Sequence, residues 1–212
     1  MINKKTIVLH SGGLDSTVCL LQAIETNKEV ISLGIDYNQK NIIENQYALD
    51  QCEKYGVERK IIKVEWDRPL KTVSINNPIS EIKGHASQYF LEGRNIVFLA
   101  LACAESAGIS AEEVWMGVSG IDSPNYPDCS LKFIESFRKM LEYGYPLGPR
   151  IITPLINKTK LEIVRKAHKL GIKKEDTWSC YNPVFSRNKT EPCDECNACI
   201  LNNYAWENFQ EK

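Results

Sequence analysis

The sequence lacks the features of membrane, secreted and strongly charged proteins. Its 212 residues contain no apolar run approaching the roughly 20 residues that a helix needs to cross a bilayer, and its first residues show no signal-peptide pattern. The 26 Lys and Arg nearly balance the 27 Asp and Glu, and the net charge of −1 gives no general electrostatic case for nucleic acid binding. We therefore expect a cytoplasmic protein with no membrane contact and no direct nucleic acid partner, although a local basic groove is not excluded.

Histidine is also scarce, and there is no internal repeat or low-complexity segment. The three histidines, His10, His85 and His168, have no partner pattern. The eight cysteines are expected to be thiols or metal ligands, because disulfides are rare in the cytoplasm. A chain of this length predicts one large domain, or one domain with a small appendage, and a sizeable core.

A glycine-rich turn is the most informative feature of the chain. Residues 11–16 read Ser-Gly-Gly-Leu-Asp-Ser, between an apolar run that predicts a buried strand and a helical apolar stripe that starts near Thr17. Adjacent glycines let backbone N–H groups approach an anion, and the helix start adds further donors and its dipole. Asp15 would repel phosphate unless a cation lies between them, so we predict a bridging Mg²⁺.

This turn is neither a Walker A motif nor a dinucleotide fingerprint. It resembles the PP-loop of ATP pyrophosphatases, which split ATP into AMP and pyrophosphate while they adenylate a substrate. The alternative is an ordinary strand-to-helix turn with a serine cap. The residues predicted to bind ATP are Leu9, His10, Ser11, Gly12, Gly13, Leu14, Asp15, Ser16 and Thr17.

Strand and helix patterns alternate along the chain. Strands are expected over residues 6–9, 30–36, 59–64, 114–118 and 151–152, and helices from near 17 and over 41–55, 94–107, 131–143 and 158–170, with Gly171 as a helix cap. Ile96, Leu99, Ala102 and Cys103 are expected to face the core. Residues 66–90 show no period and predict a long loop. The alternation predicts an α/β fold with a doubly wound parallel sheet and a ligand site at the carboxyl ends of its strands.

Four cysteines near the end of the sequence predict a metal site. Cys180 and the C-x₂-C-x₂-C run of Cys193, Cys196 and Cys199 follow the last helix that the pattern indicates. Four thiolates favour a closed, structural Zn²⁺ site, while an iron–sulfur cluster and metal-free thiols are the alternatives. Cys19, Cys52 and Cys103 are expected to be buried small hydrophobes. We predict a nucleotide-binding domain over residues 1–175 and a small zinc-binding segment over 176–212.

The order of several motifs resembles one family. The glycine turn precedes GRN at 93–95, Asp122 with YPDC at 126–129, TPL at 153–155, SCYN at 179–182 and the cysteine run. This order is similar to that of 7-cyano-7-deazaguanine synthases, which have the adenine nucleotide alpha hydrolase-like fold. The resemblance implies that ATP, ammonia and 7-carboxy-7-deazaguanine give preQ0, the 7-cyano product used for queuosine. It implies adenylation of the acid, displacement of AMP by ammonia and a second adenylation that dehydrates the amide, in a homodimer.

The same resemblance implies roles for individual side chains. The catalytic candidates are Asp15, Arg94, Lys160 and Asp128, and the substrate-binding candidates are Asp122, Tyr126 and Asp128. Arg94 could pair with phosphate or carboxylate, and Lys160 could neutralise the leaving pyrophosphate. A surface salt bridge, a solvated lysine and a stiff proline turn are the corresponding structural interpretations.

The sequence also departs from the family pattern. The departures fall at Lys40, Glu92, Ser123, Asn125 and Asn202. They leave open a paralogue of antiviral defence systems that joins a deazaguanine acid to a protein amine. A PP-loop enzyme that modifies tRNA and a nucleotide-binding regulator without chemistry are the more distant alternatives.

Overall fold

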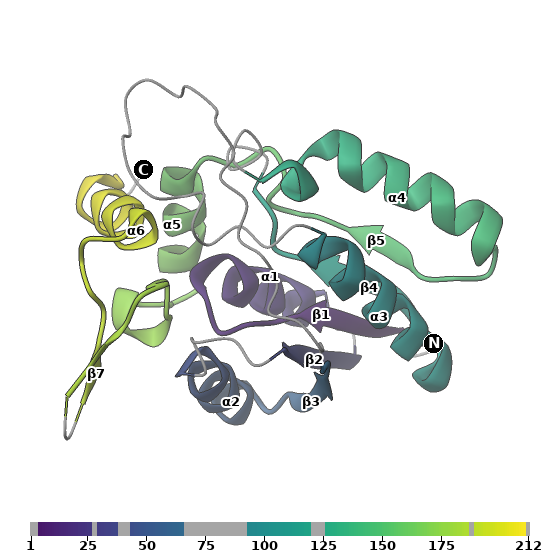
Figure 1. Ribbon diagram of the computed structural model, residues 1–212, viewed down its shortest axis with the longest axis horizontal. Helices are drawn as coiled ribbons and strands as arrows, with labels where there is room; N and C mark the ends of the chain where they lie inside the picture. Colours follow the sequence, from purple (N-terminus) through teal and green to yellow (C-terminus); the bar gives the residue numbers. More distant parts are fainter. Residues whose placement is uncertain are drawn as a thin grey trace.

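Five parallel strands form the central sheet. The structure, a computed structural model, describes residues 4–26, 29–37, 43–65, 93–119, 126–186 and 189–210. The strand order is β3-β2-β1-β4-β5, so that β1 lies at the centre (Figure 1). The strands are β1 Lys5–Leu9, β2 Glu29–Asp36, β3 Glu58–Lys63, β4 Ala111–Met116 and β5 Arg150–Ile152.

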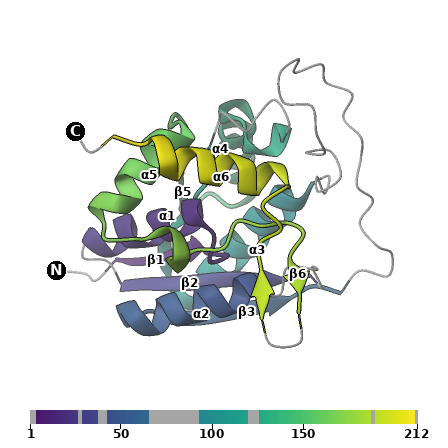
Figure 2. The ribbon, with the colours of Figure 1, turned by 90° about the vertical axis from the view of Figure 1, so that its left-hand side faces the viewer.

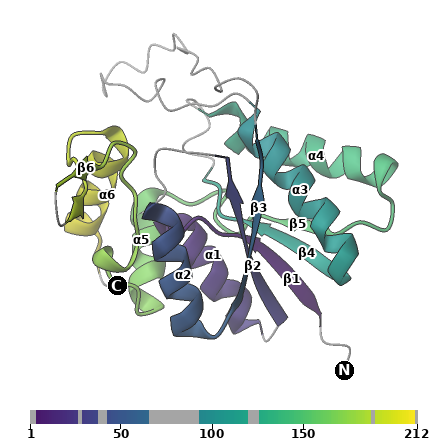
Figure 3. The same cartoon turned by 60° about the horizontal axis from the view of Figure 1, so that its bottom comes forward.

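Helices cover both faces of this sheet. They are α1 Leu14–Glu25, α2 Ile43–Tyr55, α3 Arg94–Ile109, α4 Leu131–Gly144, α5 Lys160–Lys169 and α6 Asn197–Asn208. Figure 3 shows α1 and α2 on one face and α3 and α4 on the other. The predicted doubly wound parallel fold is therefore confirmed. Among the described helices, none is both long and apolar enough to cross a membrane.

The two faces of β1 contribute to different parts of the core. Ile7 and Leu9 pack in the apolar cluster that includes Leu99 of α3 and Ile134 of α4. Val8 lies in a second cluster with residues of α1 and with Trp115 of β4. Successive side chains of a strand point to opposite faces, so one short apolar strand is buried by two helical layers.

Two details of the prediction for α3 had different outcomes. Leu99, Ala102 and Cys103 are buried, as predicted, but Ile96 is 49% exposed. The helical period places Ile96 on the same side as Leu99, yet no described element covers Ile96, whereas Asn95 in the same turn is buried. The helical period predicts on which side of the helix a residue lies, but it does not predict whether another element packs against that residue. The predicted loop over 66–90 lies outside the described residues.

The C-terminal segment contains more regular structure than the pattern indicates. α5 ends at Lys169, and Gly171 just beyond it has the left-handed conformation expected of a cap. One 3₁₀ helix and one two-stranded hairpin follow, and then α6. The elements are the 3₁₀ helix η4 Lys174–Asp176 and the antiparallel pair β6 Val184–Phe185 and β7 Thr190–Glu191 (Figure 2). The expectation that the cysteines follow the last helix is wrong, because Cys199 lies inside α6. Polar residues interrupt the apolar spacing of α6, which therefore gives little helical signal.

Candidate functional site

The glycine turn leads from β1 into α1 and is packed tightly from two sides. Gly12 has φ of 88°, and a Cβ built on it would lie 2.4 Å from the backbone oxygen of Glu44 in α2. A Cβ on Gly117, which follows β4, would lie 2.7 Å from the backbone oxygen of Asp15. Glycine is therefore required at both positions, because no side chain fits between the turn and its neighbours.

Serine hydroxyls accept hydrogen bonds from backbone N–H groups of this turn. The N–H of Ser11 donates to Ser16 Oγ at 3.2 Å, and the N–H of Gly13 donates to Ser11 Oγ at 3.3 Å. The two hydroxyl oxygens lie 3.2 Å apart. Phosphate oxygens accept the same kind of hydrogen bond, so this preformed ring of donors suits an anion.

Asp15 and Lys160 form an ion pair although 145 residues separate them. Lys160 Nζ lies 2.7 Å from Asp15 Oδ1, and both side chains are about one-fifth exposed or less. A capping box of Thr159 and Glu162 begins α5 immediately before Lys160. The backbone N–H of Thr159, with Lys158, lowers the pKa of Glu162 to about 2. This cap fixes the helix start that presents Lys160 to Asp15.

Only part of the predicted nucleotide set is accessible from outside. Ser11 is exposed, and Gly13, Asp15 and Ser16 are half-buried. The remaining residues can contact a nucleotide only through their backbone or after a rearrangement, because they are buried: Leu9, His10, Gly12, Leu14 and Thr17. The nucleotide roles of all nine remain predictions.

Arg94 lies where three separate segments meet. It begins α3, after Gly93 in the left-handed conformation. Burial lowers its pKa, but the nearby Tyr37 hydroxyl and Tyr181 more than offset that effect, so the net shift is upward and Arg94 stays charged. Its guanidinium also lies 6.0 Å from the ring centre of Phe98. A fixed cation at the carboxyl end of the sheet is suited to hold a carboxylate or phosphate.

The structure describes two of the three residues that are predicted to bind substrate. Asp128 is buried in η3 Pro127–Cys129, and its Oδ2 accepts a hydrogen bond from the N–H of Asn95 at 3.1 Å. It therefore caps the start of α3 and holds the helix turn that carries Arg94. Tyr126 is half-buried and directly precedes η3, while Asp122 lies outside the described residues. Their roles toward substrate remain predictions.

The four C-terminal cysteines converge on one point. The sulfur atoms of Cys180, Cys193, Cys196 and Cys199 all lie within 4.8 Å of one another. Backbone N–H groups donate to them: those of Asn182 and Cys193 to Cys180 Sγ at 3.3 Å, and that of Cys196 to Cys193 Sγ at 3.4 Å. Such donors stabilise thiolate charge around a metal. The cluster could therefore hold a metal ion, as predicted.

Burial keeps part of this cluster protonated without a metal. It raises the pKa of the Cys180 thiol to about 11 and also raises that of Cys199. Burial raises the pKa of Cys193 too, but backbone N–H groups from Glu195 and Cys196 outweigh it and the net shift is downward. A metal ion must therefore displace protons when it binds.

The segment that carries the four cysteines, residues 176–210 and named the cysteine segment, packs directly against the glycine turn. The N–H of Trp178 donates to the carbonyl oxygen of Gly12 at 3.1 Å, and its indole N–H donates to the carbonyl of Cys180 at 2.9 Å. The Trp178 ring lies 5.5 Å from that of Tyr47 in α2. Tyr181, the next residue after Cys180, approaches Arg94. The segment thus connects the four cysteines to the glycine turn and to Arg94.

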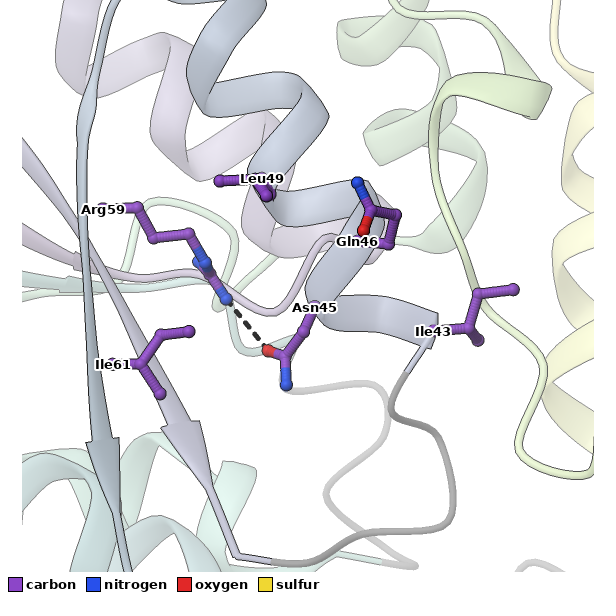
Figure 4. Close-up of a pocket in the computed structure, with 6 residues that line it drawn as sticks. All are labelled: Ile43, Asn45, Gln46, Leu49, Arg59 and Ile61. Carbon is purple, nitrogen blue, oxygen red and sulfur yellow. Dashed lines mark hydrogen bonds between the residues drawn. The ribbon is translucent and has the colours of Figure 1, made fainter.

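Sequence reasoning missed four side chains that shape this region. Tyr37 follows the carboxyl end of β2, a position that could have identified it, and Tyr181 lies in the motif that carries Cys180. Gln51 of α2 and Arg59 of β3 gave no signal. Arg59 donates to Asn45 Oδ1 at 3.0 Å in an open groove of about 460 Å³ between α2 and β3 (Figure 4).

His10 is buried beneath the turn, which predicts a pH-dependent stability. Burial and the charge of Arg59 lower the pKa of His10 to about 3, against roughly 6.5 in an unfolded chain. Below pH 6.5 the unfolded state therefore binds a proton that the folded state does not, and the free energy of unfolding falls by about 1 kcal/mol between pH 7 and pH 5.5. Urea unfolding of the unmodified chain and of His10→Gln measures this: the variant lacks the extra slope. Parallel pH dependences would contradict the prediction.

Solved structures share the fold of this chain at low sequence identity. A 4-thiouridine synthetase in complex with RNA and bound ATP has a TM-score of 0.55 and 15% identity over 97% of this chain and 54% of that protein. The tRNA thiolase NcsA of Methanococcus maripaludis, with its 4Fe-4S cluster, has a TM-score of 0.54 and 16% identity over 97% and 65%. These PP-loop enzymes confirm the fold class and, at this identity, the fold alone.

Sequence comparison gives closer relatives. The 7-cyano-7-deazaguanine synthase 2 of Rhodopseudomonas palustris (strain HaA2) is 44% identical over 210 residues, which cover 99% of this chain and 100% of that protein. The 7-cyano-7-deazaguanine synthase of Leptospira interrogans is 35% identical over 219 residues, covering 99% and 88%. The model of the family described as queuosine biosynthesis protein QueC matches residues 5–210. The chain therefore belongs to the QueC family.

Proposed function

We propose that this protein is an ATP-dependent, nitrile-forming ligase that makes 7-cyano-7-deazaguanine from 7-carboxy-7-deazaguanine and ammonia. The observation that carries the proposal is the ion pair of Asp15 and Lys160 beside the anion-binding turn, in a chain whose full-length relatives are named as this synthase. Asp15 would hold Mg²⁺ beside the phosphate site, where the ion would neutralise charge on pyrophosphate. Lys160 can then neutralise charge on the leaving pyrophosphate.

The reaction requires activation of both carboxylate oxygens. The carboxylate attacks the α-phosphorus of ATP and pyrophosphate leaves; ammonia then attacks the acyl carbon, and AMP departs with the first oxygen. The amide oxygen attacks the α-phosphorus of a second ATP and pyrophosphate leaves, and loss of AMP and two N–H protons then gives the nitrile. Arg94, fixed by Gly93 and the Asp128 cap, is placed to hold the substrate carboxylate or the adenylate phosphate.

The cysteine cluster suits one structural Zn²⁺. A tetrahedral zinc with Zn–S bonds of about 2.3 Å places its four sulfurs about 3.8 Å apart, and the separation of Cys180 Sγ and Cys193 Sγ is 3.5 Å. An iron–sulfur cluster puts iron atoms between the thiolates and needs more room than sulfurs within 4.8 Å of one another provide. Four thiolates leave no open position, so the zinc would hold residues 176–210 in place. The boundary near residue 175, the homodimer and the cytoplasmic location remain predictions.

The test combines the acid, Mg-ATP and ammonium with the purified protein and follows products by mass spectrometry. We expect the nitrile and two AMP per nitrile, and a stop at the adenylate when ammonium is omitted. An acid labelled with oxygen-18 in its carboxylate should transfer one labelled oxygen to each AMP.

Other products would redirect the proposal. Pyrophosphate release that ends at the adenylate, or AMP release that ends at the amide, would favour the paralogue that joins the acid to a protein amine, for which the departures at Lys40, Glu92, Ser123 and Asn125 leave room. Absence of turnover would point to a different acid or carrier.

A further inference from the structure

Gln51 of α2 makes four hydrogen bonds in the buried layer beneath the glycine turn of residues 11–16, which is the PP-loop. Its side chain is 4% exposed. Its Nε2 donates to the carbonyl oxygens of Asp176, at 2.6 Å, and Gly12, at 3.4 Å. Its Oε1 accepts from Thr17 Oγ1 at 2.9 Å and lies 2.7 Å from His10 Nε2. One amide thus joins β1, the PP-loop, α1 and the segment that leads to the cysteine cluster.

The chemistry of the partners fixes the orientation of this amide. The two backbone carbonyls only accept, so the NH₂ group must face them and Oε1 must face His10. His10 Nε2 then carries the proton, and Nδ1 of the neutral ring accepts from Ser32 Oγ at 2.9 Å. Ser32 Oγ accepts in turn from Arg59 Nη1 at 2.8 Å. Thr17 Oγ1 also lies 2.7 Å from the carbonyl oxygen of Gly13, so its single proton is shared between that carbonyl and Gln51 Oε1. The carbonyls of Gly12 and Asp176 still give the Gln51 amide one orientation, because they can only accept.

The Gly12 carbonyl determines where the next backbone donor points. In a trans peptide the C=O of one residue and the N–H of the next point in opposite directions. Gln51 and Trp178 hold the Gly12 carbonyl toward the protein interior. The N–H of Gly13 is therefore turned to the outer side of the loop, where Ser11 Oγ accepts it. That side is the one an anion can reach.

We propose that Gln51 is a positioning residue for nucleotide binding, which fixes the Gly12–Gly13 peptide and joins the cysteine segment to the PP-loop. The role rests on the proposed use of ATP. Gln51 itself contacts no substrate, because it lies behind the loop. It acts through the Gly13 donor on one side and through Asp176, two residues before Trp178, on the other.

The test uses Gln51→Glu, which keeps the shape and the two acceptor contacts but replaces both donors with an oxygen. That oxygen repels the carbonyls of Gly12 and Asp176. Binding of Mg²⁺ with α,β-methylene ATP, which cannot release pyrophosphate, is measured by calorimetry without any acid. We expect Kd at least tenfold higher for Gln51→Glu, and within twofold of the unmodified chain for Gln46→Glu, a matched change on the exposed side of α2.

A second variant and a second measurement cover a failure to fold. Gln51→Leu removes the four bonds without adding charge, and we expect the same loss of affinity at a temperature where melting curves show it folded. A role in stability alone would lower its melting temperature and leave Kd unchanged, which would overturn the proposal. In the unmodified chain, nitrogen-15 NMR at pH 6 is expected to show neutral His10 with its proton on Nε2; the other tautomer would also overturn it. No binding by the unmodified chain would overturn ATP use itself, and this role with it.

Discussion

Asp15→Asn is expected to lower the rate of AMP formation by about 10²–10³-fold while the fold is retained. Loss of one preorganised electrostatic contact at a site of developing charge typically costs this much. The amide that replaces the carboxylate is a poor ligand for Mg²⁺ and cannot balance the charge of Lys160, which lies 2.7 Å away. The measurement is the initial rate of AMP release at saturating acid, ATP and ammonium, with circular dichroism as the check on folding.

Lys160→Met and the double variant extend this test. The two side chains are in contact, so their losses are expected to be non-additive, and the double variant should be about as slow as the slower single variant. Lys158→Met is the matched control, because Lys158 lies just before α5, two residues from Lys160, and pairs with Glu162 and not with Asp15. A full rate in Asp15→Asn would remove Asp15 from the mechanism, and equal losses in Lys158→Met and Lys160→Met would show that only general charge matters.

The sequence predicted the fold because its signals are local. Alternating apolar strands and amphipathic helices indicate a parallel sheet by period alone, and the glycine turn needs only six consecutive residues. The cysteine cluster was equally predictable, since three of its ligands lie within seven residues. A parallel sheet also brings the carboxyl ends of its strands to one edge, which predicted a ligand site there that suits the glycine turn.

The contacts that join these parts are not local and carry no sequence pattern. Gln51 reaches the carbonyl of Asp176, 125 residues away, and a glutamine in a helix looks the same whether it faces solvent or a buried carbonyl. Arg59 is likewise one basic residue in a strand that also carries Lys60 and Lys63. The capping role of Asp128 depends on η3 lying against the start of α3. Tertiary packing decides each of these roles.

The cysteine segment links stability to the candidate nucleotide site. Trp178 is fixed on one side by the carbonyl of Gly12 and on the other by that of Cys180, a metal-ligand candidate. Loss of the metal would release Cys180 and with it the contact to Gly12. The metal site is therefore expected to affect nucleotide affinity although four thiolates leave it no part in the chemistry.

Cys196→Ser is expected to abolish metal binding and lower the melting temperature. One metal ion per chain is expected before the change and almost none after it, as measured by mass spectrometry of metals in protein purified without oxygen. Structural zinc contributes about 10–16 kcal/mol to folding in isolated zinc fingers; here the α/β core persists, so we expect a loss of about 4 kcal/mol, or roughly 8–16 °C in melting temperature. A chelator applied to the unmodified chain should reproduce the shift, and zinc should reverse it.

Cys103→Ala provides the matched control for the metal site. Cys103 is buried against the sheet and its thiol lies outside the cluster, so its loss is expected to reduce stability slightly and leave the metal content unchanged. If the link through Trp178 holds, Cys196→Ser also weakens the binding of Mg²⁺ with α,β-methylene ATP, whereas Cys103→Ala does not. Full metal content in Cys196→Ser would remove that residue from the ligand set. Metal loss with unchanged nucleotide affinity would instead show that the PP-loop keeps its shape without the cysteine segment, and that Gln51 and α2 alone suffice to hold Gly12.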